Sequence, residues 1–241
     1  MIAIDIKSKR YPAQGKAGQH LAIADFKLDV SLNEFVCLVG PSGCGKTTLL
    51  NILAGLDCDY NGAINLGQGH SQPKIGYVFQ NPRLLPWRTV RQNIELAIED
   101  RAASDNVDAL LDIMQLTQFQ HVYPERLSLG MSRRAAIIRA FAINPDLLLM
   151  DEPFVSLDTA TARQIRMLLV NLWKERPHTV LFVTHDLREA IALADRIVFL
   201  TAAPMKVVAE TVVSLSRNER DNELAIEAFR QQLFSDHPEL R

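Results

Sequence analysis

One stretch constrains this chain more than any other, a glycine-rich run that reads Gly40-Pro41-Ser42-Gly43-Cys44-Gly45-Lys46-Thr47-Thr48. An apolar run at 35–39 precedes it, and apolar residues at helical spacing follow it. Strand, glycine loop and helix in this order are typical of a phosphate-binding loop, whose backbone N–H groups surround a phosphate at a helix N-terminus. Lys46 is expected to reach the terminal phosphates of a nucleoside triphosphate, and the Thr47 hydroxyl to ligate Mg²⁺. The alternative, a chance glycine-rich turn, would not fill every fixed position of the motif.

Composition narrows the setting in which the chain works. Its 241 residues and its apolar fraction of 48% suffice for one large α/β domain. The net charge of −2 does not indicate the excess of positive charge that is typical of nucleic-acid-binding proteins, so we expect no nucleic-acid partner. The three cysteines form neither a disulfide framework nor a zinc-binding spacing, which favours a reducing cytosol. The N-terminus lacks a signal-peptide pattern and no apolar run is long enough to span a bilayer, so a partner must supply any membrane span.

Hydrophobic periodicity divides the chain into regions of different character. Residues 1–32, with about 60–78, are expected to form an antiparallel β subdomain, in which Asn61-Gly62 is a hairpin signal. Helical patterns dominate about 82–140, with a helix cap expected at Asp105 or Asn106. Strands and helices then alternate, which predicts a parallel sheet with helices on its faces. About 216–241 is expected to be a polar, weakly helical tail, and all of 1–241 a single domain.

Polar side chains follow three of the predicted strands. Asp151 and Glu152 end a buried run, where two acids are costly unless they hold a metal or do chemistry, so we assign Asp151 to Mg²⁺ and Glu152 to the general base. Gln80 can touch both the metal and the attacking water, and His185 can donate a hydrogen bond to the γ-phosphate. Each also has a simpler interpretation, as a solvated strand end or a structural histidine. Strand ends of a doubly wound sheet converge on the nucleotide crevice, which favours the functional interpretation.

Together these stretches resemble the motifs of the nucleotide-binding subunits of ABC transporters, over about residues 1–215. In chain order they match the Walker A loop at 40–48, the Q-loop at Gln80, the signature motif at 127–131, Walker B at 147–152, the D-loop at 156–158 with Asp158, and the switch histidine at His185. The resemblance implies an α/β fold with a P-loop (RecA-like) parallel sheet core, an N-terminal antiparallel β subdomain and an inserted α-helical subdomain. It also implies a second ATPase subunit, expected to be an identical copy, bound head to tail with two ATP molecules between the copies. Mg²⁺ would be held by Thr47, Gln80 and Asp151.

The signature motif departs from the family's Leu-Ser-Gly-Gly-Gln at two positions. Leu129 replaces the first glycine and Met131 replaces the glutamine. Leu129 therefore places a side chain where the family brings backbone close to a phosphate. Ser128 and Gly130 keep the hydroxyl and the N–H that are expected to meet the γ-phosphate of the opposite copy, so we expect an active site. Ser128 can also be an ordinary helix N-cap, which presents an anion site in its own right.

The family stacks the adenine base on an aromatic residue that precedes the phosphate-binding loop. Tyr11 is the best match, and His20 is the alternative. Stacking of a base on an aromatic side chain is worth about 1–3 kcal/mol in nucleic-acid complexes. A surface tyrosine without function is the simpler interpretation of Tyr11.

A short apolar segment after Gln80 points to a group within the family. Leu84-Leu85-Pro86-Trp87 is similar to a segment of nitrate, sulfonate and taurine importer ATPases, where it suits the docking of a cytoplasmic permease helix. Trp87 can equally pack in the core of the helical segment. We therefore expect an ATP-hydrolysing subunit at the cytoplasmic face of the inner membrane, working with permease subunits and a substrate-binding protein on a small anion. The alternatives are an exporter or lipid-trafficking ABC ATPase, a non-transport ABC ATPase, and a small-molecule phosphoryl transferase.

Overall fold

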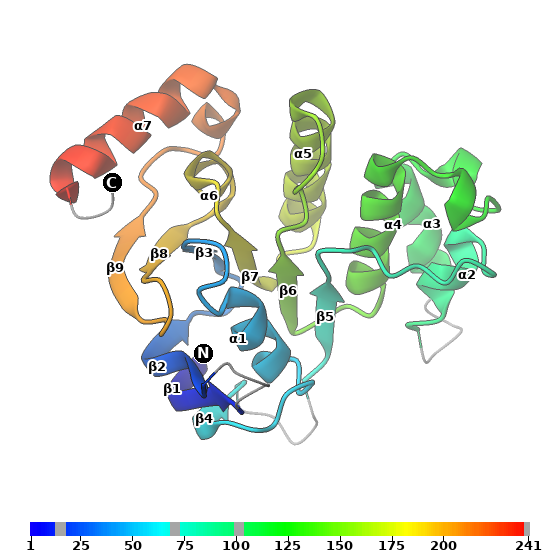
Figure 1. Cartoon of the computed structure of the whole chain (residues 1–241). Helices are drawn as coiled ribbons and strands as arrows, with labels where there is room; N and C mark the ends of the chain where they lie inside the picture. The colour runs from blue at the N-terminus through cyan, green and yellow to red at the C-terminus, as the bar shows by residue number, and fades with distance from the viewer. Residues whose placement is uncertain (13–17, 68–72, 99–103, 239–241) are drawn as a thin grey trace. The chain divides into compact units, whose positions relative to one another are not determined.

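The computed structural model describes residues 1–12, 18–67, 73–98 and 104–238. The chain forms two compact units, whose segments can be followed in Figure 1 by the colour scale of residue number. The first unit joins Met1–His70 to Thr179–Arg241, and the second is Ser71–His178. The second unit is longer than the helical subdomain expected at about 82–140, and it also contains strands. The predicted subdomain boundaries therefore remain a prediction.

An antiparallel sheet in the order β2-β1-β4 belongs to the first unit. Its strands are β1 (Ile2–Tyr11), β2 (His20–Val30) and β4 (Asn61–Asn65). Ile4 of the central strand lies opposite Leu28 on one side and Ile64 on the other. Ile2, Ile4 and Ile6 are all buried, so the period of two in the sequence correctly predicts one face packed on the core.

The Asn61-Gly62 hairpin prediction is wrong. Both residues begin β4, which pairs with β1 and not with a strand adjacent in sequence. Gly62 has φ +150°, and a Cβ atom there would lie only 2.2 Å from the carbonyl oxygen of Asp5. Glycine is needed at this position because two backbones approach closely, and not because the chain turns.

The first unit also contains three parallel strands in the order β7-β3-β8, extended by the antiparallel strand β9. The elements of this part are β3 (Phe35–Val39), α1 (Lys46–Leu53), β7 (Thr179–Thr184), α6 (Leu187–Leu193), β8 (Arg196–Leu200) and β9 (Val207–Val212). β7 is buried along its whole length, as expected for a strand covered on both faces. Val39 lies in register with Thr184, so the segments that follow β3 and β7 leave the sheet at the same edge.

The tail predicted for about 216–241 contains well-defined structure. A short 3-10 helix, η4 (Glu219–Asp221), leads into α7 (Glu223–Asp236). Ile226 and Leu233 of α7 are buried, and Arg188 of α6 donates a hydrogen bond of 2.7 Å to Glu227. α7 is therefore packed against α6, the helix that follows β7.

The second unit combines a parallel strand pair with helices. Its elements are β5 (Ile75–Val78), α2 (Val90–Glu95), α3 (Ser104–Ile113), η2 (Thr117–Phe119), η3 (Pro124–Arg126), α4 (Leu129–Ala142), β6 (Leu147–Asp151) and α5 (Thr159–Glu175). β5 pairs with β6, so the predicted β subdomain, which was expected to reach about residue 78, does not include this strand. The cap expected at Asp105 or Asn106 is also wrong, because both residues lie inside α3.

Candidate functional site

The loop between β3 and α1 has the backbone conformation of a phosphate cradle. Gly43 and Gly45 adopt φ values of +77° and +118°, which a residue with a side chain rarely adopts. A Cβ atom at Gly45 would also lie 3.1 Å from the carbonyl oxygen of Ala22. Gly45 is the N-cap of α1, and the partial positive charge of a helix N-terminus favours an anion there.

Lys46 is folded into this loop. Its side chain is buried, and its Nζ atom donates hydrogen bonds to the carbonyl oxygens of Gly40 at 2.7 Å and Pro41 at 2.9 Å. A buried ammonium needs such acceptors. Phosphate oxygens are better acceptors than neutral carbonyls because they are charged. The cradle therefore fits the terminal phosphates that the sequence predicts for it.

Tyr11 lies beside the same loop. It ends β1, and its hydroxyl oxygen is 3.0 Å from the Thr48 Oγ1 atom of α1. Tyr11 and His20, the two candidates for the base platform, are cross-strand partners in the antiparallel sheet. Tyr11 is 37% exposed, so part of the residue is open to a ligand.

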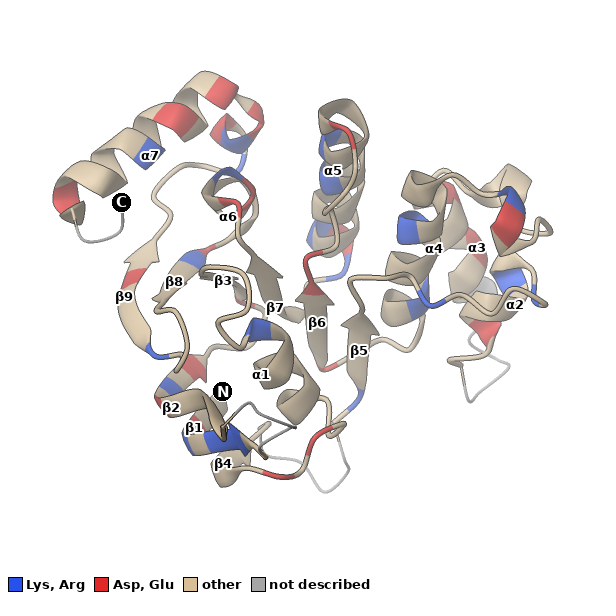
Figure 2. Cartoon of the chain, viewed as in Figure 1, with Lys and Arg blue, Asp and Glu red and all other residues tan. Residues whose placement is uncertain are grey.

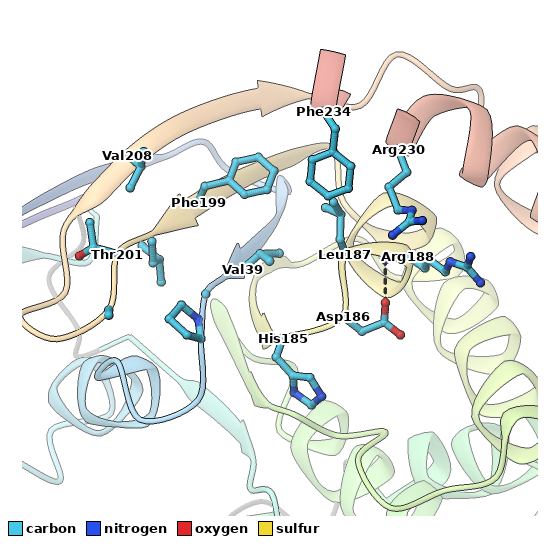
Figure 3. Close-up of a pocket in the computed structure, with 14 residues that line it drawn as sticks. Val39, His185, Asp186, Leu187, Arg188, Phe199, Thr201, Val208, Arg230 and Phe234 are labelled. Atoms are coloured by element: carbon cyan, nitrogen blue, oxygen red, sulfur yellow. Dashed lines mark hydrogen bonds between the residues drawn. The ribbon is translucent and has the colours of Figure 1, made fainter. Parts of the chain in front are cut away.

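His185 follows β7 at the edge of the sheet where the glycine loop begins. It is exposed, and it lines a pocket of about 780 Å³ together with Gly40 and Pro41. In Figure 3 its imidazole points away from the apolar side chains of Phe199 and Phe234 on the other side of this pocket. The turn around it is fixed, because Asp186 accepts a hydrogen bond of 2.8 Å from the backbone N–H of Arg188 and so caps α6.

The two acids predicted for chemistry lie in the second unit, at the end of β6. Asp151 is the last residue of the strand and is 4% exposed. Burial raises the pKa of the neighbouring Tyr77, and the negative charge of Asp151 raises it further. Glu152 adopts a left-handed backbone conformation with φ +42°. Such a conformation costs about 1–3 kcal/mol for a residue with a side chain and is concentrated at functional sites, which supports a catalytic hypothesis for Glu152.

Gln80 lies two residues beyond β5, which ends at Val78. Its carbonyl oxygen accepts a hydrogen bond from the Nη1 atom of Arg133 in α4. Arg133 is 3% exposed, and its Nη2 atom donates to the carbonyl oxygen of Val155 at 3.3 Å. One guanidinium therefore holds the Gln80 segment and the turn that follows Glu152.

A second arginine of α4 extends this arrangement. Arg139 donates to the carbonyl oxygens of Pro82 at 2.7 Å and Arg83 at 2.9 Å. Burial lowers the pKa of both Arg133 and Arg139. Figure 2 shows their helix carrying several positive bands. Sequence reasoning missed these contacts, since arginines on a helix usually face solvent.

The predicted signature residues form the start of α4. Ser128 is the N-cap, and its Oγ atom accepts a hydrogen bond of 3.2 Å from the N–H of Met131, as the N-cap interpretation predicts. Leu129 is 43% exposed at the helix N-terminus, whereas Gly130 is buried. Asp158 of the predicted D-loop likewise caps α5: the backbone N–H of Thr161 donates to its carboxylate at 2.9 Å, and hydrogen bonding with Thr161 lowers its pKa.

Gly130 is required by packing inside the chain itself. A Cβ atom there would lie 2.7 Å from the Cγ2 atom of Thr161 in α5. We expect Gly130→Ala to lower the free energy of unfolding by about 1–3 kcal/mol, because α4 and α5 must separate. Urea denaturation measures the loss. Thr161→Ser removes the opposing methyl group, so the double variant should recover most of it, and a double variant as unstable as Gly130→Ala would contradict this explanation.

Comparison with known proteins decides the family. The family model described as ABC transporter matches residues 23–155. The chain belongs to the ABC transporter family. It is 37% identical over 240 residues to the aliphatic sulfonates import ATP-binding protein SsuB of Bacillus subtilis (strain 168), an alignment that covers 98% of this chain and 93% of the relative. It is 40% identical over 233 residues to the nitrate import ATP-binding protein NrtD of Synechococcus elongatus, covering 92% and 84%.

Solved structures agree with this assignment. The ABC transporter fold of this chain aligns with the ATP-binding cassette MJ0796 in a dimeric post-hydrolysis state bound to ADP and Pi, with a TM-score of 0.76 and 30% identity. The alignment covers 90% of this chain and all of that cassette. The predicted P-loop α/β fold is thereby confirmed, and the chain is an ATPase cassette of the ABC type. In the described part of the chain, no helix is both long and apolar enough to cross a membrane.

The donor set predicted for Mg²⁺ comprises a hydroxyl, an amide and one carboxylate, from Thr47, Gln80 and Asp151. These are oxygen ligands, which Mg²⁺ prefers, and Mg²⁺ commonly uses only one or two carboxylates together with phosphate oxygens and water. Among the described residues, three or more His, Cys, Asp or Glu side chains nowhere gather into a metal-binding group. The predicted oxygen donors are of the kind that Mg²⁺ uses when phosphate oxygens and water complete its coordination.

Proposed function

We propose that this chain is the ATP-hydrolysing subunit of an ABC importer for a small anion, of the aliphatic sulfonate or nitrate type. The observation that carries the proposal is the extent of the similarity to SsuB, which spans nearly the full length of both chains. Relatives named for sulfonate import and for nitrate import are similar to this chain at nearly equal identity. The similarity therefore supports the class of anion and not one substrate.

Each predicted site residue has a role in this proposal. Lys46 and the N–H groups at the start of α1 bind the terminal phosphates of ATP, the substrate. Glu152 accepts a proton from the attacking water, while Gln80 and His185 orient that water. Thr47, Gln80 and Asp151 would hold Mg²⁺, which would neutralise part of the negative charge of the phosphates.

A second copy of the chain completes the site in this proposal. Ser128 and Gly130 of one copy face the γ-phosphate bound by the other, with Leu129 and Met131 beside them and Asp158 at the interface. The start of α4 supports this role, since a capped helix N-terminus attracts anions and Leu129 is on its exposed side. The dimeric state of the MJ0796 cassette bound to ADP and Pi supports a dimeric arrangement.

Reconstitution with the transmembrane partner tests the proposed function. The protein is co-expressed with candidate permease subunits and a candidate substrate-binding protein, chosen from the genes that neighbour its own, and then placed in lipid vesicles. We expect ATP hydrolysis to rise when an alkanesulfonate-loaded or nitrate-loaded binding protein is added. Hydrolysis that responds instead to a lipid or an exported compound would favour the exporter alternative, and transfer of phosphate to an organic acceptor would favour a phosphoryl transferase.

Trp87 provides a site for the permease. Its side chain is 69% exposed, so the core-packing interpretation is wrong, while Leu84 and Leu85 beside it are half-buried. An exposed tryptophan next to apolar residues is typical of a docking position for a partner helix. The proposal places a cytoplasmic helix of the permease on this patch.

We expect Trp87→Ser to lower the amount of permease that co-purifies with the protein by about tenfold or more, because buried tryptophans dominate interface energies. Hydrolysis by the isolated protein should stay within about twofold. Met167→Ser is the matched control, since Met167 is an exposed apolar residue of the same unit on α5. Equal co-purification of both variants with the permease would remove Trp87 from the interface.

A further inference from the structure

Lys9 is a buried cation close to the nucleotide loop that the assigned motifs leave unexplained. It lies on β1, two residues before Tyr11, and is 3% exposed. Its Nζ atom donates hydrogen bonds to the Asp57 carboxylate at 2.8 Å and to the Asp59 carbonyl oxygen at 2.7 Å. Burial lowers the pKa of Lys9, but the hydrogen bond and charge of Asp57 outweigh burial and the pKa is raised. The side chain is therefore a fixed positive charge.

This charge lies over the ring of Tyr11. The Lys9 Nζ atom is 4.8 Å from the ring centroid, within the range of a cation–π interaction. The other end of the ring is held as well, because the Tyr11 hydroxyl is hydrogen-bonded to the Thr48 hydroxyl. Thr48 lies in the first turn of α1, two residues after Lys46. Tyr11 is thus held at its face by one anchored group and at its hydroxyl by another.

We propose that Lys9 is a positioning residue for nucleotide binding, which holds the Tyr11 ring in place as the platform for the adenine base. The inference rests on the proposed role of Tyr11 in the ATPase site. A free tyrosine side chain loses rotamer entropy when a base stacks on it, whereas a ring already fixed by Lys9 and Thr48 has less entropy to lose. Lys9 itself is held by Asp57 and Asp59, so it can keep the ring fixed without moving.

The same contacts relate the base platform to the phosphate cradle. Asp57 follows α1 closely, and its N–H donates to the Asn51 carbonyl oxygen of that helix. Tyr11 therefore has two connections to α1, one through Thr48 and one through Lys9 and Asp57. Lys9 keeps the ring at a constant distance from the loop that binds phosphate. A fixed distance between the ring and the loop increases the affinity for a ligand that contacts both, such as a purine nucleoside triphosphate.

Binding of two probes tests the proposal. We expect Lys9→Met to raise the dissociation constant for ATP with Mg²⁺ about fivefold, because the cation–π contact that fixes the Tyr11 ring is lost. Binding of inorganic tripolyphosphate, which has no base, should be unchanged. In steady-state hydrolysis KM for ATP should rise while kcat is retained. Lys9→Arg keeps a cation over the ring and should bind ATP as the wild type does.

Two further variants separate positioning from folding. Lys7→Met is the matched control, because Lys7 is on the same strand but is exposed and pairs with Asp5. It should bind both probes as the wild type does. The double variant Lys9→Met/Asp57→Asn avoids a carboxylate left without its cation, and it should show the same selective loss of ATP affinity as Lys9→Met.

Equal weakening of ATP and tripolyphosphate by Lys9→Met would overturn the proposal, since Lys9 would then act on the loop as a whole. Tyr11→Ala should lose more ATP affinity than Lys9→Met, and unchanged ATP binding by Tyr11→Ala would also overturn it. A wild-type protein that neither binds nor hydrolyses ATP would instead refute the proposed function itself.

Discussion

Replacing Glu152 by glutamine is expected to lower the rate of ATP hydrolysis by about 10²–10⁴-fold while ATP binding is retained. Glutamine keeps the size of the side chain but cannot accept a proton from the attacking water. Both residues carry a side chain of the same length, so glutamine adds no new backbone strain at φ +42° and the loss should be chemical and not structural. Phosphate release measures the rate, fluorescence of a bound nucleotide analogue measures the affinity, and size-exclusion chromatography should show an ATP-bound dimer that accumulates.

Glu175→Gln is a matched control for this variant. Glu175 is an exposed acid of the same unit and is the last residue of α5. Its replacement should leave hydrolysis within about twofold of the wild type, in line with surface substitutions remote from a site. Wild-type turnover by Glu152→Gln would assign the general base to another residue.

Gly62→Ala is expected to lower the free energy of unfolding by about 3 kcal/mol. The new Cβ would lie 2.2 Å from the Asp5 carbonyl oxygen and 2.8 Å from the Ile6 Cα atom, both backbone atoms that cannot rotate away. Pairing between β1 and β4 would have to be given up locally. Urea or thermal unfolding measures the loss.

Gly67→Ala separates this steric effect from backbone strain alone. Gly67 also has a positive φ, +108°, but apart from its chain neighbours no described residue has an atom within 4 Å of a Cβ built there. Its replacement should cost only about 1–2 kcal/mol. Equal losses at Gly62 and Gly67 would mean that the contact with Asp5 does not decide the stability.

Gly62→Ala is also expected to weaken ATP binding. The substitution disturbs β1, and β1 carries Tyr11, the proposed platform for the adenine base.

The parts of the fold that could be predicted are those with a local signal. Alternating isoleucines in β1 and the strand–loop–helix around Lys46 each depend on neighbours in sequence, and both are confirmed. The Asn61-Gly62 dipeptide is also a local signal, but here the close approach of β1, more than 50 residues away, determines the glycine. The partner of β5 could not be read from its sequence either, because strand pairing is a long-range choice.

Prediction of the site has the same limit. The sequence predicts the phosphate loop, Asp151, Glu152 and Ser128 as site residues because motifs have fixed spacing in the chain. Arg133 and Lys9 were not assigned roles, since their contacts join segments separated by 22 or more residues and 48 residues respectively. Nothing in the local pattern distinguishes a buried arginine or lysine from the solvent-exposed majority.

Arg133 has a mechanical consequence for the second unit. Ser128 caps α4, and one turn after the first residue, Leu129, the same helix carries the guanidinium that binds the backbone of Gln80 and Val155. Gln80 cannot shift without moving α4 with it or breaking a part-buried hydrogen bond to a charged group, which costs about 1.5–3 kcal/mol. This contact therefore favours a joint movement of the residues after β5 and of α4, whose N-cap is Ser128.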